Sequence, residues 1–148
     1  MPRPVFVGHN IAVGGQPTSE ELAQLRQAGF RAVINLRQNG EAVQALSPAE
    51  EGRQAAAIGL AYRHVPVSSL DLQPDRVDAF KAAVESLPGP IYVHCGAGQR
   101  ATALALTYVA PSEGLTGDQA LEKARDVGHE IVDANLAGLV QWAAENPR

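Results

Sequence analysis

The chain has 148 residues and a formal net charge of −4, from 12 Lys and Arg against 16 Asp and Glu. An acidic chain with no basic stripe cannot neutralise the phosphates along a strand, which excludes nucleic acid as an expected partner. The length predicts one domain over residues 1–148, large enough to bury a core.

The other compositional features indicate a soluble, cytoplasmic protein. The single cysteine excludes an internal disulfide and fits a reducing compartment. The sequence contains no run that resembles a signal peptide or reaches membrane-spanning length, so we expect no membrane partner. The histidines have no ligand spacing to one another or to the cysteine, and we therefore expect neither a metal nor another cofactor. The oligomeric state stays open.

Segments with strand and helix character alternate along the chain. The predicted strands cover residues 5–7, 11–13, 32–36, 61–67 and 91–93. Helices are predicted to begin near residues 17, 47, 74, 101 and 116, and a last helix covers 131–144. This alternation predicts an α/β fold in which helices flank a central, mostly parallel sheet of about four to five strands.

Several helices have recognisable starts. Capping-box spacing occurs in the pairs Thr18 with Glu21 and Thr116 with Gln119. Ser47 precedes a proline and stands three residues before Glu50, which predicts an N-cap with a capping glutamate. The segment over 101–109 is rich in Ala and Leu, and its lack of polar residues predicts a helix buried at the centre of the fold.

The only cysteine lies between the strand predicted over 91–93 and the helix predicted from 101. In largely parallel sheets, ligands bind at the carboxyl ends of strands, which is where Cys95 falls. The backbone N–H groups of such a loop and the positive end of the following helix bind an oxyanion, and the same field favours a thiolate nucleophile. Arg100 at the end of the loop can bind an oxyanion through two parallel hydrogen bonds.

The residues around this loop distinguish a reactive cysteine from a structural one. No Asp or Glu occurs from Ser86 to Ser112, so we expect an anion-binding site in an anion-free neighbourhood. The alternative is a buried structural cysteine, since free cysteine is among the most buried residue types. Such a cysteine does not need two glycines and an arginine within the next five residues, so a reactive thiolate is the favoured interpretation.

The motif His94-Cys95-x-x-Gly98-x-Arg100 resembles the signature loop of cysteine-dependent phosphatases, the tyrosine and dual-specificity group. Further motifs are similar to one bacterial branch, the phosphatase-like domain of beta-lactamase hydrolase-like proteins. These motifs are Gly15-Gln16-Pro17, the block 28–37, Gly40-Glu41 and His64-Val65-Pro66-Val67. The resemblance covers roughly residues 5 to 110 and implies a cysteine-dependent phosphatase-like fold.

Two features of the loop depart from the usual phosphatase pattern. Four residues separate Cys95 from Arg100, whereas the phosphatases have five; four is the spacing of rhodanese-type sulfurtransferases, although the bacterial branch itself keeps it. The residue after the arginine is Ala101 instead of a Ser or Thr that stabilises the departing thiolate, and Thr102 follows one place later. One position along a helix is a rotation of about 100°, so we do not expect the Thr102 hydroxyl to replace it.

Three functions are compatible with these residues. The first is hydrolysis of phosphate monoesters, in a phosphorylated small molecule or a phosphoprotein, through a cysteinyl-phosphate on Cys95. The second is sulfur transfer through a Cys95 persulfide, which needs no carboxylic acid. The third is a non-catalytic module that binds phosphate or another anion, although binding alone does not require a thiol. We favour hydrolysis, because a histidine before the cysteine is usual in the phosphatases and orients their loop.

The resemblance assigns nucleophilic attack to Cys95 and oxyanion binding to Arg100. The residues expected to contact phosphate are those of the loop and its neighbours: His94, Gly96, Ala97, Gly98, Gln99, Arg100 and Arg37. Within this set, Gln99 is a candidate to position water. Arg37 would guide an anionic substrate, with a solvated loop arginine as the alternative.

The general acid is the least determined member of the site. In the phosphatases it is an Asp in the loop after the strand that corresponds to 61–67, and Asp71 is our choice. Asp75 lies in the first turn of a predicted helix, where a carboxylate complements the dipole, and Asp71 could itself be a turn residue. The position nearest to the family's acid could instead be Ser68, which would leave the acid missing.

Overall fold

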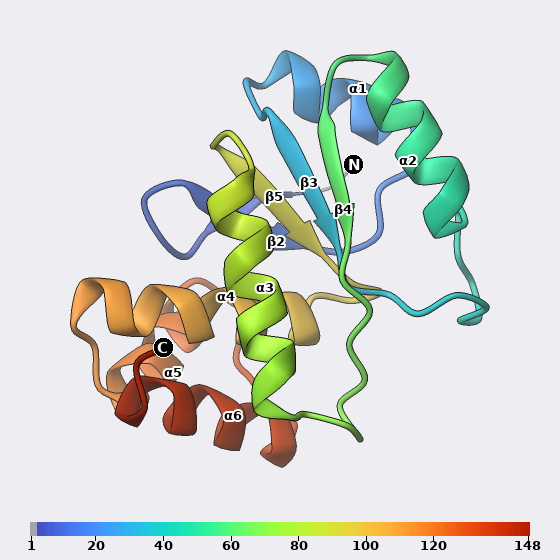
Figure 1. Cartoon of the computed structure of the whole chain (residues 1–148). Coiled ribbons are helices and arrows are strands. Elements are labelled where there is room, and N and C mark those ends of the chain that lie inside the picture. The colour runs from blue at the N-terminus through green and yellow to red at the C-terminus, as the bar shows by residue number, and fades with distance from the viewer. Residues whose placement is uncertain (1–2) are drawn as a thin grey trace.

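The computed structural model describes residues 3–148, and within that range it contains five strands and six helices (Figure 1). The strands are β1 (Val5–Phe6), β2 (Ile11–Gly14), β3 (Ala32–Asn35), β4 (Ala61–His64) and β5 (Ile91–His94). The helices are α1 (Ser19–Gln27), α2 (Pro48–Ala57), α3 (Pro74–Ser86), α4 (Gln99–Glu113), α5 (Gly117–Asp126) and α6 (Ala134–Glu145).

The strands form one sheet in the order β1-β2-β5-β3-β4. The three pairings among β2, β5, β3 and β4 are parallel, and only β1 runs antiparallel, against β2. The predicted α/β fold with a central, mostly parallel sheet is therefore confirmed.

The register of the parallel strands brings their carboxyl ends to one level. Gly14 at the end of β2 and Asn35 at the end of β3 both pair with His94 at the end of β5, and Asn35 also pairs with His64 of β4. The segments that leave these four strands therefore begin side by side at the same edge of the sheet. That edge is where the ligand site of such a sheet is expected.

Helices cover both faces of the sheet (Figure 1). On one face, Leu22 and Leu25 of α1 and Ala55 of α2 pack against apolar residues of the strands. On the other face, the larger core cluster joins residues of α3, α4, α5 and α6, among them Phe80 and Leu136. The Cys95 side chain belongs to this second cluster, so the loop after β5 is anchored in the core.

Helix α4 is the buried central helix that the sequence predicts, since residues 101–107 all have buried side chains. It is longer than the predicted segment over 101–109, because Pro111 is accommodated in its last turns and Gly114, with φ of 69°, ends it. A left-handed residue at this position closes a helix without a steric penalty only when it is glycine.

The predicted N-caps of α1, α2 and α5 are confirmed with one difference. Capping boxes form in the two predicted pairs, Thr18 with Glu21 and Thr116 with Gln119. The Ser47 hydroxyl caps α2 by accepting from the backbone N–H of Glu50. The Glu50 carboxylate, however, accepts from Arg53 and Gln54 instead of reaching back to the cap, because these side chains lie on the same exposed side of the helix.

Two further predicted boundaries differ from the structure by three residues. β4 ends at His64 instead of residue 67, since Pro66 has no N–H with which to continue the ladder. The last helix begins at Ala134 instead of residue 131, because the Asp133 carboxylate accepts from the backbone N–H of Leu136 and sets the N-cap there. Within residues 3–148, none of the helices combines the length and apolar character needed to cross a membrane.

Candidate active site

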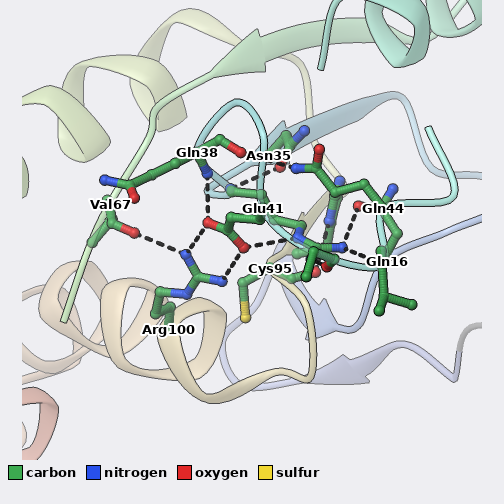
Figure 2. Close-up of polar contacts among 12 residues, drawn as sticks. Gln16, Asn35, Gln38, Glu41, Gln44, Val67, Cys95 and Arg100 are labelled. Carbon is green, nitrogen blue, oxygen red and sulfur yellow. Dashed lines mark hydrogen bonds and ion pairs between the residues drawn. The ribbon is translucent and has the colours of Figure 1, made fainter. Parts of the chain in front are cut away.

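The segments that leave the four parallel strands together build one polar cluster around the cysteine (Figure 2). These segments contribute the Gln16 side chain after β2, the Arg37 guanidinium and the Glu41 carboxylate after β3, the Val67 carbonyl after β4 and the Cys95 thiol after β5. The aligned strand ends thus explain why residues distant in the sequence meet here.

The Cys95 sulfur lies among backbone N–H groups. The N–H groups of Gly98 and Ala101 donate to Sγ over 3.2 and 3.4 Å. Both belong to the start of α4, whose first turn contains no acidic residue, so the positive end of the helix faces the sulfur. The sulfur therefore lies at the amino end of α4, and Cys95 is only 2% exposed.

Gly98 gives the loop its shape. Its φ is 112°, a conformation that other residues rarely adopt. A Cβ at this position would also lie 3.3 Å from Nδ1 of His129. The glycine therefore allows the chain to turn sharply enough for its own N–H to reach the sulfur.

Three carbonyl groups of the loop are held from outside. They are the carbonyl of Cys95, 3.1 Å from His94 Nδ1; that of Gly96, 3.2 Å from the backbone nitrogen of Gln16; and that of Gly98, 2.8 Å from the Thr102 hydroxyl. In a trans peptide the C=O and N–H bonds point in opposite directions. Each group that holds one of these carbonyl oxygens therefore acts as an anchor, because it makes the N–H of the next residue point to the opposite side. Gly15 permits the second anchor, because a Cβ there would lie 3.0 Å from the Gly96 oxygen.

The Thr102 hydroxyl does not take the place of the missing Ser or Thr after Arg100. It donates to the Gly98 carbonyl and lies 3.3 Å from Nδ1 of His129. The prediction that it is rotated away from that role is therefore confirmed.

Arg100 is held along one edge of its guanidinium group. Nη1 and Nη2 donate to the two carboxylate oxygens of Glu41 over 2.7 and 2.9 Å, and Nη1 also donates to the Val67 carbonyl over 2.9 Å. A guanidinium has five N–H donors, and these three bonds occupy both hydrogens of Nη1 and one of Nη2. The two remaining donors lie on the Nε–Nη2 edge, which is a second bidentate fork for an oxyanion, and the guanidinium group also interacts with the Cys95 sulfur.

Glu41 accepts hydrogen bonds from two arginines, and Figure 2 shows its contact with Arg100. Besides Arg100, it accepts from Nε of Arg37 over 3.0 Å and from the backbone N–H of Gln38 over 2.6 Å. The hydrogen bonds from Arg100 above all, and those from Gln38 and Arg37, lower the pKa of Glu41 to about 2 against the effect of burial. The expectation of an anion-free neighbourhood is therefore wrong. The loop after β3 places the Glu41 carboxylate at the site, and this residue lies outside the interval 86–112 on which the expectation was based.

Arg37 is buried, with 5% of its surface exposed. Its guanidinium donates to Glu41, to the Gln16 side chain and to the carbonyl groups of Ala42 and Val43, which occupies four of its five donors. The structure thus places Arg37 at the site, but mainly as the support of the loop that carries Glu41. A direct substrate contact stays a prediction for its remaining Nη2 hydrogen.

His94 lies behind the loop, fully buried. Its Nδ1 faces the Cys95 carbonyl, and its Nε2 is 2.6 Å from Oε2 of Glu51, which is also fully buried. The His94 ring stacks on Tyr92, with 6.0 Å between the ring centroids. His94 therefore supports the loop from outside rather than lining the space above the sulfur.

The Gln99 side chain ties the loop to a distant segment. Its Nε2 donates to the Glu130 carbonyl over 2.6 Å, and its Oε1 accepts from the backbone N–H of Val132 over 2.9 Å. Both ends of the amide are thus engaged by the chain that precedes α6. The expected role in positioning water stays untested, and the structure adds a supporting role.

Asp71 lies in the loop between β4 and α3, and its side chain is about half exposed, at 52%. Its carboxylate accepts from Nη2 of Arg76 over 3.0 Å. The residue lines a cavity of about 340 Å³ together with His64, Ser68 and Gln38. Gln38 connects this cavity to the cluster through its bond to Glu41, but Cys95 and Arg100 are not among the described residues that line it.

The alternatives to Asp71 have local partners. Asp75 lies in the first turn of α3, 3.6 Å from Arg76, as expected for a helix-start residue. Ser68 accepts from the backbone N–H of Leu70 and so shapes the turn. Within residues 3–148, no three His, Cys, Asp or Glu side chains are grouped so that they could hold a metal ion.

Reasoning from the sequence missed two acidic residues of the site, Glu41 and Glu51. Gly40-Glu41 is part of the resemblance to the bacterial branch, and that was a usable signal. The sequence contains no signal for the role of Glu51, because a Glu in the first turn of a helix usually complements the helix dipole at the surface.

Comparisons with known proteins show the family of the chain. The family described as "Beta-lactamase hydrolase-like protein, phosphatase-like domain" matches residues 5–110. A beta-lactamase hydrolase-like protein of Xylella fastidiosa (strain 9a5c) is 34% identical over 152 residues, and one of Agrobacterium fabrum is 29% identical over 138 residues. These matches cover 99% and 93% of the chain but 34% and 31% of the relatives, so the chain spans about a third of their length.

Solved structures share the fold. The protein nma1982 of Neisseria meningitidis superposes with a TM-score of 0.78 at 22% identity, over 94% of this chain and 96% of that one. PTPMT1 superposes with a TM-score of 0.76 at 14% identity, over 97% and 94%. At such identities the likeness concerns the fold alone, and the fold is that of cysteine-phosphatase-like proteins.

Proposed function

The chain belongs to the phosphatase-like domain family of beta-lactamase hydrolase-like proteins, and we propose that it hydrolyses phosphate monoesters through a cysteinyl-phosphate on Cys95. The observation that carries the proposal is the sulfur that accepts from the N–H groups of Gly98 and Ala101 at the start of α4. A thiolate held in this way is a nucleophile inside an oxyanion site.

In the first step the Cys95 thiolate attacks phosphorus in line with the leaving oxygen. The Sγ–P bond forms and the P–O bond to the leaving group breaks, while N–H groups of the loop and the Nε–Nη2 edge of Arg100 stabilise the equatorial oxygens. The leaving alkoxide takes a proton from a carboxylic acid, and Asp71 is our candidate for that acid.

In the second step a water molecule attacks the phosphorus of the cysteinyl-phosphate. The Asp71 carboxylate, now without its proton, accepts a proton from that water, the S–P bond breaks and the thiolate re-forms beside inorganic phosphate. Glu41 does not suit the acid role, because its pKa of about 2 leaves it ionised at neutral pH.

Sulfur transfer is the second candidate, and the four-residue spacing between Cys95 and Arg100 favours it. In that reaction the Cys95 thiolate takes the outer sulfur atom of a donor such as thiosulfate, which leaves as sulfite. The resulting persulfide passes the sulfur atom to cyanide or a thiol. The half-exposed Asp71 with its Arg76 partner is no obstacle here, since no carboxylic acid is needed.

One experiment separates these functions. The protein and its Cys95→Ser variant are assayed with an aryl phosphate and, in parallel, with thiosulfate plus cyanide. Phosphate release that is lost in the variant, without thiocyanate formation, is the expected result. Thiocyanate formation without phosphate release would replace the proposal by sulfur transfer, and inactivity in both assays would leave an anion-binding module.

A further inference from the structure

A carboxylate that the mechanism above does not use is fully buried behind the cysteine loop. Glu51 of α2 is 0% exposed, with Oε2 2.6 Å from Nε2 of His94 and Oε1 accepting from the Gln16 side chain over 2.8 Å. Burying a carboxylate costs several kcal/mol unless it is paired and hydrogen-bonded. The burial of Glu51 therefore depends on its hydrogen bond with His94 and on the proton in that bond.

The directions of the hydrogen bonds fix how many protons this pair holds. The Cys95 carbonyl can only accept, so Nδ1 of His94 carries a hydrogen. The contact between Nε2 and Glu51 contains a second one, since a bare nitrogen and a bare carboxylate would repel each other. The pair as a whole is then neutral. The ring is an imidazolium when it holds both protons, and a neutral imidazole when one of them lies on Glu51.

We propose that Glu51 is a positioning residue that keeps His94 as an imidazolium, which fixes the Cys95 carbonyl and places a positive charge next to the nucleophile. The cation lies closer to Cys95 than the anion does, because Nδ1 faces the Cys95 carbonyl while Nε2, at another edge of the ring, faces Glu51. The net field of the pair therefore favours the thiolate. This inference rests on the proposed use of Cys95 as a nucleophile.

The pair also belongs to a continuous chain of hydrogen bonds that joins the two ends of the loop. From the Cys95 carbonyl it passes through the side chains of His94, Glu51, Gln16, Arg37, Glu41 and Arg100. Members of such a network hold one another in place. Glu51 is thus connected to both the nucleophile and the arginine that binds the oxyanion.

Other titratable groups surround the network and are the same in every variant tested below. Burial raises the pKa of Tyr62 and Tyr92, which therefore stay neutral up to alkaline pH, and the pKa of Glu41 near 2 keeps it ionised. The groups that face the loop or the pair are Arg37, Glu41, His64, Tyr62, Tyr92, Arg100 and His129. A difference caused by a substitution at Glu51 therefore reports on the pair.

The proton positions can be tested by ¹⁵N NMR of the imidazole rings at pH 7, with a His94→Asn protein to assign the His94 signals. We expect both ring nitrogens of His94 to be protonated in the wild type and only Nδ1 in Glu51→Gln. The glutamine preserves both contacts, because its oxygen can accept from Gln16 and its amide can donate to Nε2 of His94. The matched control is Glu50→Gln, the same change on the side of α2 that faces Arg53.

The charge can be tested by the rate at which iodoacetamide alkylates Cys95 between pH 5 and 9. Glu51→Gln should move the profile to higher pH, with alkylation at pH 6 slowed about threefold to tenfold and the two rates converging at high pH. Glu50→Gln should follow the wild type. A purely structural role of Glu51 would change stability without displacing the profile.

Two results would overturn the inference: a singly protonated His94 ring in the wild type, or a Glu51→Gln profile that superimposes on that of the wild type. If Glu51→Gln does not fold, the wild-type NMR spectrum alone decides. Other results would contradict the proposed function. They are alkylation of wild-type Cys95 no faster than that of a free thiol, or no release of phosphate from a phosphate monoester by the wild-type protein.

Discussion

The bidentate bond between Glu41 and Arg100 allows a prediction of stability that changes with pH. The pKa of Glu41 is lowered from 4.5 to about 2, and its side chain is 20% exposed, so solvent screens it only in part. By linkage this shift corresponds to about 3 kcal/mol of free energy of unfolding. In Glu41→Gln one acceptor oxygen becomes an amide group that meets the arginine donors without a charge. We expect the variant to lose about 2–3 kcal/mol at pH 7.

The sign of the pH dependence follows from the direction of the shift. A carboxylate whose pKa is lower in the folded state stabilises fully above its unfolded value of 4.5, and this contribution disappears as the pH falls towards 2. The difference in unfolding free energy between wild type and Glu41→Gln should therefore be constant from pH 7 to about 5. It should then shrink steadily as the pH is lowered to about 3.

Urea denaturation at pH 7, 5, 4 and 3 measures this difference. The matched control is Glu130→Gln, which removes an exposed carboxylate paired with Arg125 and should change stability by less than about 1 kcal/mol. A Glu41→Gln difference that does not change between pH 7 and pH 3 would refute the electrostatic reasoning. It would indicate that only the shape of the glutamate side chain matters.

Two further substitutions test the loop and the acid. Gly98→Ala should lower the free energy of unfolding by about 1–3 kcal/mol, because φ is 112° and the new Cβ meets His129. In the same urea assay, Gly138→Ala in α6 has open space around its Cβ and should be neutral or stabilising; equal losses would contradict this account of Gly98. Asp71→Asn should reduce phosphate release from an alkyl phosphate by a factor of about 10²–10⁴, and that from an aryl phosphate with a good leaving group far less. With Asp75→Asn as the control, an unchanged rate in steady-state assays would remove Asp71 from the mechanism.

The parts of this fold that the sequence predicts are those with a local signal. The capping box of Thr18 with Glu21 and the apolar segment over 101–109 depend on neighbouring residues only, and the structure confirms both. The position of Cys95 at a strand end also follows from local order, since a strand, a glycine-bearing loop and a helix succeed one another within residues 91–113. The end of β4 does not follow from a local signal in the same way, because this strand ends where its pairing with β3 ends, at Asn35 and His64.

The acidic part of the site could not be predicted in the same way. Glu41 reaches Arg100 across 59 positions and Glu51 reaches His94 across 43, and both contacts depend on how strand ends align and how α2 packs. Residues 86–112 contain no Asp or Glu. The charge around a site, however, depends on all residues that lie near it in the folded protein, including those distant in the sequence. Asp71 shows the reverse case: it stands in the loop where the acid was expected, yet its bond is to Arg76.

A carboxylate beside an oxyanion site is consistent with anion binding once the charges are counted in space. Arg37 and Arg100 contribute two positive charges and Glu41 one negative charge, while Glu51 and His94 together are neutral in our proposal. With Cys95 as a thiolate the cluster is balanced, so the buried sulfur does not carry an uncompensated charge. Without Glu41, both guanidinium groups would lose the carboxylate that accepts from them, and along this edge of Arg100 only the bond to the Val67 carbonyl would remain. The negative charge of Glu41 therefore weakens the attraction of the site for phosphate. Its bonds to Arg100 also determine which two donors of that guanidinium group face the phosphate.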